Sequence, residues 1–140
     1  MLKISIIQIG KTKQKELEAL IAEQYKRVQS SVKLEVVTVK AAKDLFEKIP
    51  QSSFVIALDV AGKEMTSQEL AQFLETRKNQ GDSHLVFLIG PPDGFSSYPV
   101  QPDLKLSLSK MTFSHQTIRL LLAEQIYRAV SILEGKPFAR

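Results

Sequence analysis

Two uninterrupted apolar runs decide most of what this chain can fold into. Residues 54–58 read Phe-Val-Ile-Ala-Leu, and residues 85–89 read Leu-Val-Phe-Leu-Ile. Runs this short and this apolar are typical of strands that are covered on both faces. Such strands occur in parallel sheets between layers of helices, so the two runs favour an α/β fold.

Patterns typical of strands and helices alternate along the rest of the chain. Thr66 and Glu69 form a capping box ahead of one helix. Further strands are expected at residues 2–9, 32–39 and 104–108, and helices or short helical segments at 17–28, 41–49, 66–74 and 114–133. In the first helix the apolar positions at helical spacing are Leu17, Leu20, Ile21, Tyr25 and Val28. This order predicts a single α/β domain over residues 1–140, with a parallel sheet flanked by helices on both faces.

The expected helix at residues 114–133, for which Ser114 is a candidate N-cap, is apolar on two sides. One stripe contains Ile118, Leu121, Leu122, Ile126, Ala129, Val130 and Leu133. The second stripe consists of Leu120, Ala123 and Tyr127. Because a helix that is apolar nearly all round is buried on two sides, we expect the second stripe to face a two-fold partner in a homodimer. The alternative is a helix that lies deep within its own protomer.

Composition excludes several kinds of site. The chain has no cysteine and only two histidines, His84 and His115, which excludes disulfides, thiolate metal sites and histidine-rich metal sites. Neither Gly10 nor Gly90 begins the glycine pattern of a dinucleotide or P-loop site, and no Gly-x-Ser-x-Gly elbow is present. No stretch resembles a signal peptide or has the length of a membrane span. We therefore expect a cytoplasmic protein that uses no metal and no membrane.

The positive charge is concentrated near the beginning of the sequence. The formal net charge is +4, and the excess lies within residues 1–50, where Lys11, Lys13 and Lys15 form a cluster. A patch of this kind can bind the phosphate backbone of a nucleic acid. A solvated surface with no partner is the alternative for so mild a charge.

Parallel α/β sheets bind ligands beyond the carboxyl ends of their strands. The turns after Leu58, Ile89 and Leu108 are therefore the expected site. The third turn is rich in hydroxyl groups and runs into the helix at residues 114–133, whose amino end offers free N–H groups to a polar ligand. His115 lies in the first turn of that helix, where the positive helix end favours the neutral imidazole.

Several short motifs together resemble a known family. The motifs are Leu58-Asp-Val-Ala-Gly-Lys63, Phe87-Leu-Ile-Gly90, Asp93-Gly94 and Leu108-Ser-Lys-Met-Thr-Phe113, with His115, Arg119, Glu124-Gln125 and Tyr127-Arg-Ala129 after them. Over essentially its whole length, the chain resembles the ribosomal RNA large subunit methyltransferase H family, small bacterial members of the SPOUT or α/β-knot class. The motif at residues 108–113 is the most specific of the set.

This resemblance implies a SPOUT-type α/β knot with a trefoil knot in the C-terminal part. It also implies a homodimer that binds S-adenosyl-L-methionine and methylates N3 of a pseudouridine in the 23S rRNA of assembled ribosomes. The residues that match the family's cofactor contacts are Leu58, Gly90, Leu108, Ser109, Lys110, Met111, Thr112 and Phe113. The candidates for catalysis are His115 as a proton acceptor, Phe138 as a stacking surface for the target base and Arg140 as a phosphate contact.

The end of the chain differs from the usual pattern of that family. Members commonly end in Tyr-His and a basic residue, whereas this chain ends in Phe138-Ala139-Arg140. Pro91 also stands where a second glycine is usual, which removes one backbone N–H donor. Two interpretations therefore stay open. The first is an active RNA methyltransferase, and the second is a catalytically impaired SPOUT-fold module that binds the cofactor or the ribosome. An unrelated doubly wound nucleotide-binding protein is the third interpretation.

Overall fold

The computed structural model describes residues 1–136, so the predictions for Phe138 and Arg140 lie outside the described residues. The strands are β1 (Lys3–Ile9), β2 (Lys33–Val39), β3 (Phe54–Glu64), β4 (His84–Leu88) and β5 (Leu104–Ser107). The helices are α1 (Lys15–Val28), α2 (Ala42–Glu47), α3 (Ser67–Asn79) and α4 (His115–Leu133). The alternation of strands and helices predicted from the sequence is confirmed.

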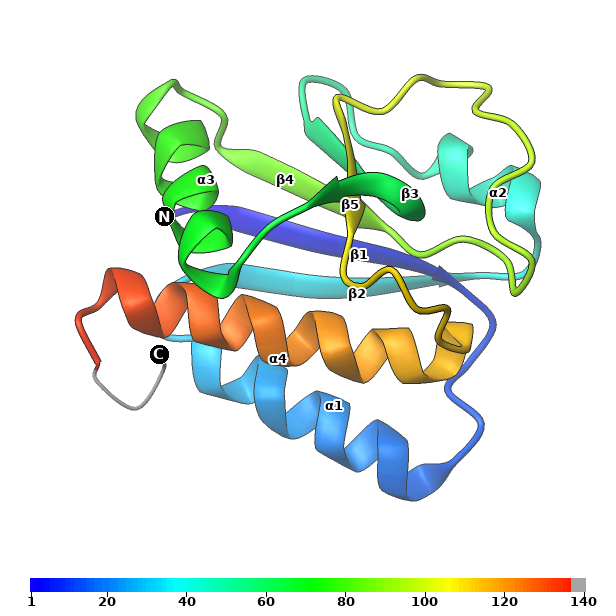
Figure 1. The fold of residues 1–140 in the computed structure, drawn as a ribbon, viewed down its shortest axis with the longest axis horizontal. Helices are drawn as coiled ribbons and strands as arrows, with labels where there is room; N and C mark the ends of the chain where they lie inside the picture. The colour runs from blue at the N-terminus through cyan, green and yellow to red at the C-terminus, as the bar shows by residue number, and fades with distance from the viewer. Residues whose placement is uncertain (137–140) are drawn as a thin grey trace.

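The five strands form one parallel sheet in the order β2-β1-β4-β3-β5 (Figure 1). Because all strands run in the same direction, their carboxyl ends meet at one edge, called the carboxyl edge below. The predicted parallel sheet flanked by helices is thus confirmed. The apolar runs at residues 54–58 and 85–89 fall in β3 and β4, which lie inside the sheet.

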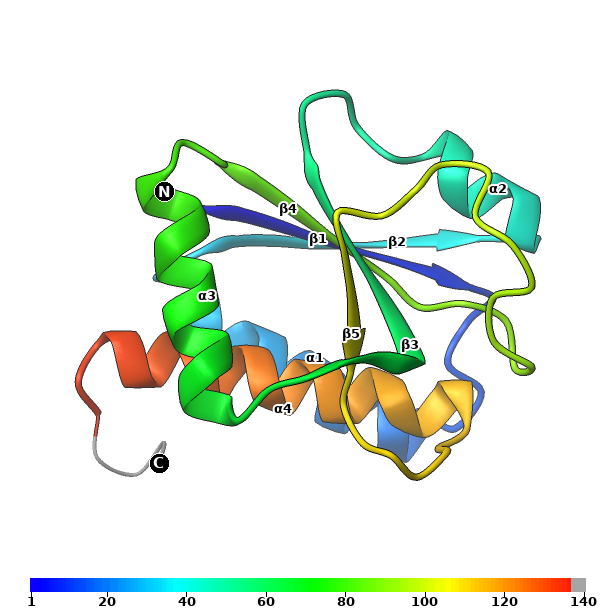
Figure 2. The same ribbon diagram turned by 45° about the horizontal axis from the view of Figure 1, so that its top comes forward.

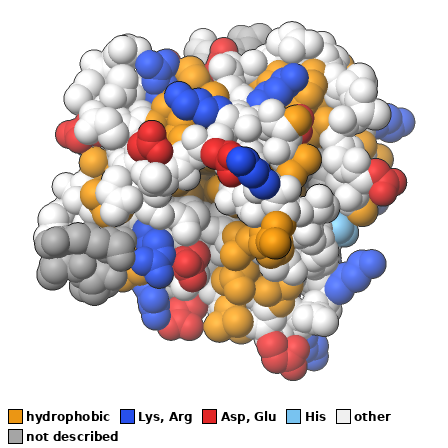
Figure 3. Space-filling model, in the orientation of Figure 1, with side chains coloured by type: hydrophobic (Ala, Val, Ile, Leu, Met, Phe, Trp, Pro, Cys, Tyr) orange, Lys and Arg blue, Asp and Glu red, His pale blue; other side chains and the backbone are white. Residues whose placement is uncertain are grey.

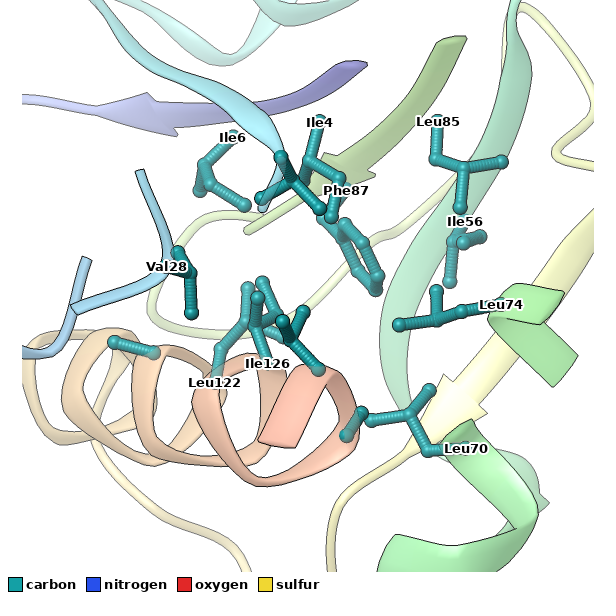
Figure 4. Packing of buried hydrophobic residues seen from close by; sticks show 14 of the residues in the cluster. Ile4, Ile6, Val28, Ile56, Leu70, Leu74, Leu85, Phe87, Leu122 and Ile126 are labelled. Atoms are coloured by element: carbon teal, nitrogen blue, oxygen red, sulfur yellow. The ribbon is translucent and has the colours of Figure 1, made fainter. Parts of the chain in front are cut away.

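Helices cover both faces of the sheet (Figure 2). The face with Ile4, Ile6 and Phe87 packs against α1, α3 and α4 and forms the larger core, part of which is seen in Figure 4. The opposite face, with Ile7 and Leu88, packs against Leu45 and Phe46 of α2. Successive side chains of a strand point to opposite faces, which explains why these buried strands are apolar at every position.

Side-chain caps fix the beginnings of α3 and α4. Thr66 accepts a hydrogen bond from the Glu69 N–H at 3.0 Å, and the Glu69 carboxylate accepts one from the Thr66 N–H at 2.8 Å. The predicted capping box is therefore confirmed. Ser114 caps α4, because its hydroxyl oxygen accepts a hydrogen bond from the Thr117 N–H at 3.1 Å.

Helix α4 lies between α1 and α3 and packs against both. Ala123 is 0% exposed within the single chain, and Leu120 and Tyr127 pack against the same core. The prediction that Ala123 faces a partner subunit is therefore wrong, and the alternative of a helix buried in its own protomer holds for this residue. Leu121 is partly exposed and lies outside the core cluster, although its sequence position suggested a core stripe.

Two other apolar residues are more exposed than their patterns predict. Leu20 is 50% exposed, because α1 buries only the side that carries Ile21, Tyr25 and Val28. Val36 is exposed because β2 is an edge strand with one neighbour. Helical or alternating spacing gives the direction of a side chain but does not say which neighbour is present to cover it.

Strand β3 continues to Glu64, well beyond the apolar run that predicted it. Its pairing with β5 shifts register between Leu58 and Lys63, which is an irregularity of the bulge type. Gly62 makes this possible: a Cβ atom at this position would lie 2.6 Å from the backbone carbonyl carbon and oxygen of Lys105. The close approach of two backbones therefore requires glycine here.

Candidate functional site

A cavity of about 530 Å³ opens at the carboxyl edge, beside the middle of β3 and the ends of β4 and β5. Its wall includes Leu58, Gly90, Leu108, Ser109 and the run Met111–Phe113. The structure therefore brings together every predicted cofactor residue except Lys110. The volume lies within the range of roughly 300–1,000 Å³ that is usual for small-molecule sites.

The β3 side of the cavity carries a carboxylate whose position is fixed. Asp59 accepts hydrogen bonds from the Tyr98 hydroxyl at 2.6 Å and from the Ala61 N–H at 2.9 Å. These bonds, the one from Tyr98 first, hold the pKa of Asp59 below its ordinary value, and the carboxylate stays ionised at neutral pH. Burial, followed by the bond to Asp59, raises the pKa of Tyr98. Asp59 was not predicted as a site residue.

Aromatic side chains hold the β4–β5 loop in place. The rings of Phe95 and Tyr98 stack with their centroids 4.8 Å apart, and Phe46 of α2 meets both rings edge-on. Lys105 Nζ lies 4.6 Å from the centroid of the Tyr98 ring. Phe95 also lines the cavity, so α2 supports one of its walls through these rings.

Gly90 occupies a tight position between the strand end and this loop. A Cβ atom at Gly90 would lie 2.8 Å from Phe95 Cε2, which is closer than real Cβ contacts. The turn that follows is closed by a hydrogen bond from the Gly94 N–H to the Pro91 carbonyl at 2.8 Å. The absence of a side chain at Gly90 therefore lets Phe95 form a wall of the cavity.

The third loop connects β5 to α4. The Ser107 hydroxyl donates to the Ser109 carbonyl at 2.8 Å, and the Ser109 hydroxyl oxygen accepts from the Met111 N–H at 3.0 Å. These local bonds give the loop a defined shape. Lys110 points away from the cavity, and its Nζ lies 3.9 Å from a carboxylate oxygen of Glu64.

His115 stands at the rim of the cavity, at the first position of α4. Burial lowers the pKa of His115, and the positive charges of Arg119 and Lys13 lower it further. The imidazole is therefore neutral at pH values where an ordinary histidine is half charged, as predicted from its position. Its Nδ1 atom is buried and has no partner within the part of the chain that the structure describes.

Arg119 is a buried charge that was not among the predicted site residues. It is 1% exposed, and its guanidinium donates to the Ile9 carbonyl at 2.6 Å and to the Gly10 carbonyl at 3.0 Å. It also donates to the Thr12 hydroxyl oxygen at 3.1 Å. The bonds connect the β1–α1 loop to α4 beside His115. A buried arginine amid apolar helix positions was the available signal, because such a charge needs partners.

Other kinds of site receive no support from residues 1–136. No group of three or more His, Cys, Asp or Glu side chains in this range could hold a metal ion. In the same range no helix is both long and apolar enough to cross a bilayer. His84 is part of a different cluster, with its Nε2 atom 2.7 Å from the hydroxyl oxygen of Ser5.

A parallel sheet covered by helices on both faces, with a cavity at its carboxyl edge, is the architecture of the α/β domains that bind ligands at this edge. The family described as "Predicted SPOUT methyltransferase" matches residues 2–138, and the chain belongs to this family.

Several relatives from different organisms carry the name "Ribosomal RNA large subunit methyltransferase H". The protein of Christiangramia forsetii is 40% identical, with 96% of this chain and 97% of the relative covered. The proteins of Carboxydothermus hydrogenoformans and Protochlamydia amoebophila are each 38% identical, with 98% or more of both chains covered. Among solved structures, "a probable methylase family protein from Haemophilus influenzae Rd KW20" matches with a TM-score of 0.51 and 10% identity. It covers 95% of this chain, which spans 66% of that protein, and the likeness concerns the fold alone.

Proposed function

We propose that this protein is an S-adenosyl-L-methionine-dependent methyltransferase that modifies N3 of a pseudouridine in the 23S rRNA of assembled ribosomes. The observation that carries the proposal is the convergence of Leu58, Gly90 and residues 108–113 on one cavity at the carboxyl edge. The relatives named above support ribosomal RNA as the substrate. We further propose a single α/β-knot domain over residues 1–140, with a C-terminal trefoil knot, that acts in the cytoplasm as a homodimer.

The cavity has the chemical character that this cofactor needs. Leu58, Leu108 and Phe113 offer apolar walls for an adenine ring, while backbone groups at the strand ends can bind its polar edge. The missing side chain at Gly90 lets the Phe95 ring form part of the wall, and the unpartnered Nδ1 of His115 offers a polar contact to a ligand. The carboxylate of Asp59 adds a negative charge, which favours a cationic ligand.

The reaction requires the protein to position two reacting atoms and to allow the loss of one proton. When bound, the cofactor supplies an activated methyl group that is attached to a sulfonium. The chain must hold the acceptor nitrogen in line with that methyl group, and positioning of this kind supplies most of the acceleration. The acceptor N–H must also lose its proton. His115, neutral and at the rim, can accept a proton, and water or ribosomal groups are the acceptors that we favour.

A methylation assay tests the proposal. Ribosomes from a strain that lacks the pseudouridine methylation are incubated with the protein and radiolabelled cofactor, and the labelled nucleotide is mapped. We expect label at one pseudouridine of 23S rRNA. Cofactor binding without any transfer would favour the alternative, a catalytically impaired module that binds the cofactor or the ribosome. Absence of cofactor binding would contradict the proposed activity and would leave, of these two, only a module that binds the ribosome.

Deletion of residues 136–140 is expected to abolish methylation while leaving cofactor affinity nearly unchanged. We propose that the tail reaches the partner's cofactor site, where Phe138 stacks on the target base and Arg140 holds a phosphate. Base stacking on an aromatic ring contributes about 1–3 kcal/mol per base. Calorimetric titration measures cofactor affinity and the ribosome assay measures transfer. Lys33→Gln, at the start of β2 and outside the tail, is the control, and full activity of the truncated protein would remove the tail from the site.

Leu121→Glu is expected to convert the proposed dimer into a folded monomer. Leu121 on α4 and Leu20 on α1 are both apolar and both reach solvent in the protomer. Figure 3 shows hydrophobic side chains gathered where α4 and α1 face the viewer. A carboxylate in a desolvated two-fold seam would meet its own copy, which is strongly unfavourable.

Light scattering measures the assembly, and thermal melting checks the fold. Val36→Glu, at the exposed edge strand β2, is the control that should stay dimeric. A wild-type monomer at micromolar concentration would end the dimer proposal.

A further inference from the structure

The lysine cluster of the β1–α1 loop is not used by the site described above. Lys11, Lys13 and Lys15 are all exposed, and none has a carboxylate within 4.0 Å among residues 1–136. Several other basic residues of the chain do have such partners, for example Arg77 with Asp82 at 3.3 Å. The loop that carries the cluster, residues 10–15, is called the lysine loop below.

The backbone of the lysine loop is held by side chains from α4. Gln116 accepts a hydrogen bond from the Lys13 N–H at 3.0 Å, and its amide nitrogen donates to the Lys11 carbonyl at 3.5 Å. Arg119 fastens Gly10 and Thr12 on the other side. Gly10 adopts a φ of 71°, the left-handed conformation that lets the chain turn away from β1. Exposed lysines are thus presented from a backbone with a fixed shape.

The lysine loop lies beside the mouth of the cavity. His115 and Ile118, on the same turns of α4 as Gln116 and Arg119, line the cavity. The charge of Lys13 reaches far enough to lower the pKa of His115, which is an independent sign that the two side chains are near each other.

We propose that the lysine loop is the surface that binds the phosphate backbone of the RNA whose target nucleotide enters the cavity. This inference rests on the proposed function and adds to it the part of the protein that holds the substrate strand. Lysines act as point charges toward phosphates, and each contact releases condensed counterions. Because Gln116 and Arg119 fix the loop before RNA arrives, less ordering is required on binding.

A matched pair of triple variants tests the role of these charges. The loop variant carries Lys11→Gln, Lys13→Gln and Lys15→Gln, and the control carries Lys26→Gln, Lys33→Gln and Lys78→Gln. The control lysines are also exposed, but they lie at the ends of α1 and α3 and at the start of β2, away from the carboxyl edge. Both variants remove the same charge. Calorimetric titration with S-adenosyl-L-methionine should give wild-type affinity for both.

Binding of a fluorescein-labelled single-stranded RNA is then measured by anisotropy over a range of salt concentrations. Each phosphate contact contributes about 0.7 to the slope of log K against log salt, so losing three contacts makes the slope shallower by about 2. The loop variant should then bind roughly 100-fold more weakly at 0.1 M salt. The control should keep the wild-type slope. Equal slopes in both variants would overturn the inference.

A third variant distinguishes the effect of the fixed loop backbone from the effect of the lysine charges. Gln116→Leu removes both hydrogen bonds to the lysine loop but leaves every lysine in place. RNA affinity should fall several-fold with an unchanged salt slope, and wild-type affinity would contradict the role of Gln116. The loop variant could instead lose binding to ribosomes while its salt slope for RNA stays unchanged. That result would identify a ribosomal protein as the partner and would contradict the inference. If the wild type methylates no ribosomal RNA, the proposed function itself fails.

Discussion

Ala123→Glu is expected to unfold the protein rather than to separate subunits. Ala123 is 0% exposed at the place where α4 packs between α1 and α3. A glutamate there would bring a longer side chain and a charge into an apolar cluster, and an unpaired buried charge destabilises by several kcal/mol. A loss of about 4 kcal/mol or more removes most of the stability of a typical domain.

Thermal melting followed by circular dichroism measures this effect. Leu121→Glu is the matched control, since it places the same charge two positions earlier on the outward side of α4. The control should still melt in a cooperative transition, as a folded monomer does, while the Ala123 variant should show no cooperative transition at ordinary temperatures. A folded monomeric Ala123→Glu protein would mean that the residue faces a partner after all.

Gly90→Val is expected to lower the affinity for S-adenosyl-L-methionine by about 100-fold, which corresponds to about 2.7 kcal/mol. The added Cβ would lie 2.8 Å from the Phe95 ring, so either the ring or the strand end must shift. Phe95 stacks on Tyr98, which binds Asp59, and a shift would therefore alter two walls of the cavity. The substitution therefore lowers affinity in two ways: it changes the shape of the cavity wall, and it places a side chain against the ligand.

A double-substitution cycle separates these two routes. Gly90→Ala is compared in the wild type and in a Phe95→Ala background, with titration heats measured for all four proteins. If Phe95 transmits the effect, the cost of Gly90→Ala should be much smaller once the ring is absent. Undiminished affinity of Gly90→Val would remove Gly90 from the cofactor site.

The sequence predicted the elements well because their signals are local. Thr66 and Glu69 lie three positions apart, and the run at residues 85–89 needs no distant information to indicate a buried strand. The predictions that failed concern side chains whose exposure depends on neighbouring helices. Whether Leu20 is covered depends on where α4 lies relative to α1, and whether Ala123 faces a partner or α1 and α3 depends on the packing of three helices. Helical spacing contains no such information.

The candidate site could be located from sequence because parallel sheets place ligands at the carboxyl edge. Leu58 lies within β3, Gly90 follows the end of β4 and Leu108 follows the end of β5, so three positions far apart in sequence lie on neighbouring strands. Lys110 was expected among them only through the family motif, and its side chain turns to Glu64 instead. The bond between Asp59 and Tyr98 could not be predicted, because it joins β3 to a loop without regular structure.

Arg119 has a consequence for how the protein is made. Its partners Ile9, Gly10 and Thr12 are synthesised before it, at separations of 107–110 residues along the chain. Contacts between such distant positions close late in folding, because the chain entropy of the whole intervening segment must be lost first. A growing chain that has not yet released α4 from the ribosome cannot complete the cavity wall or hold the lysine loop. The newly made protein therefore gains its binding surface only after α4 has been synthesised and has packed against the sheet.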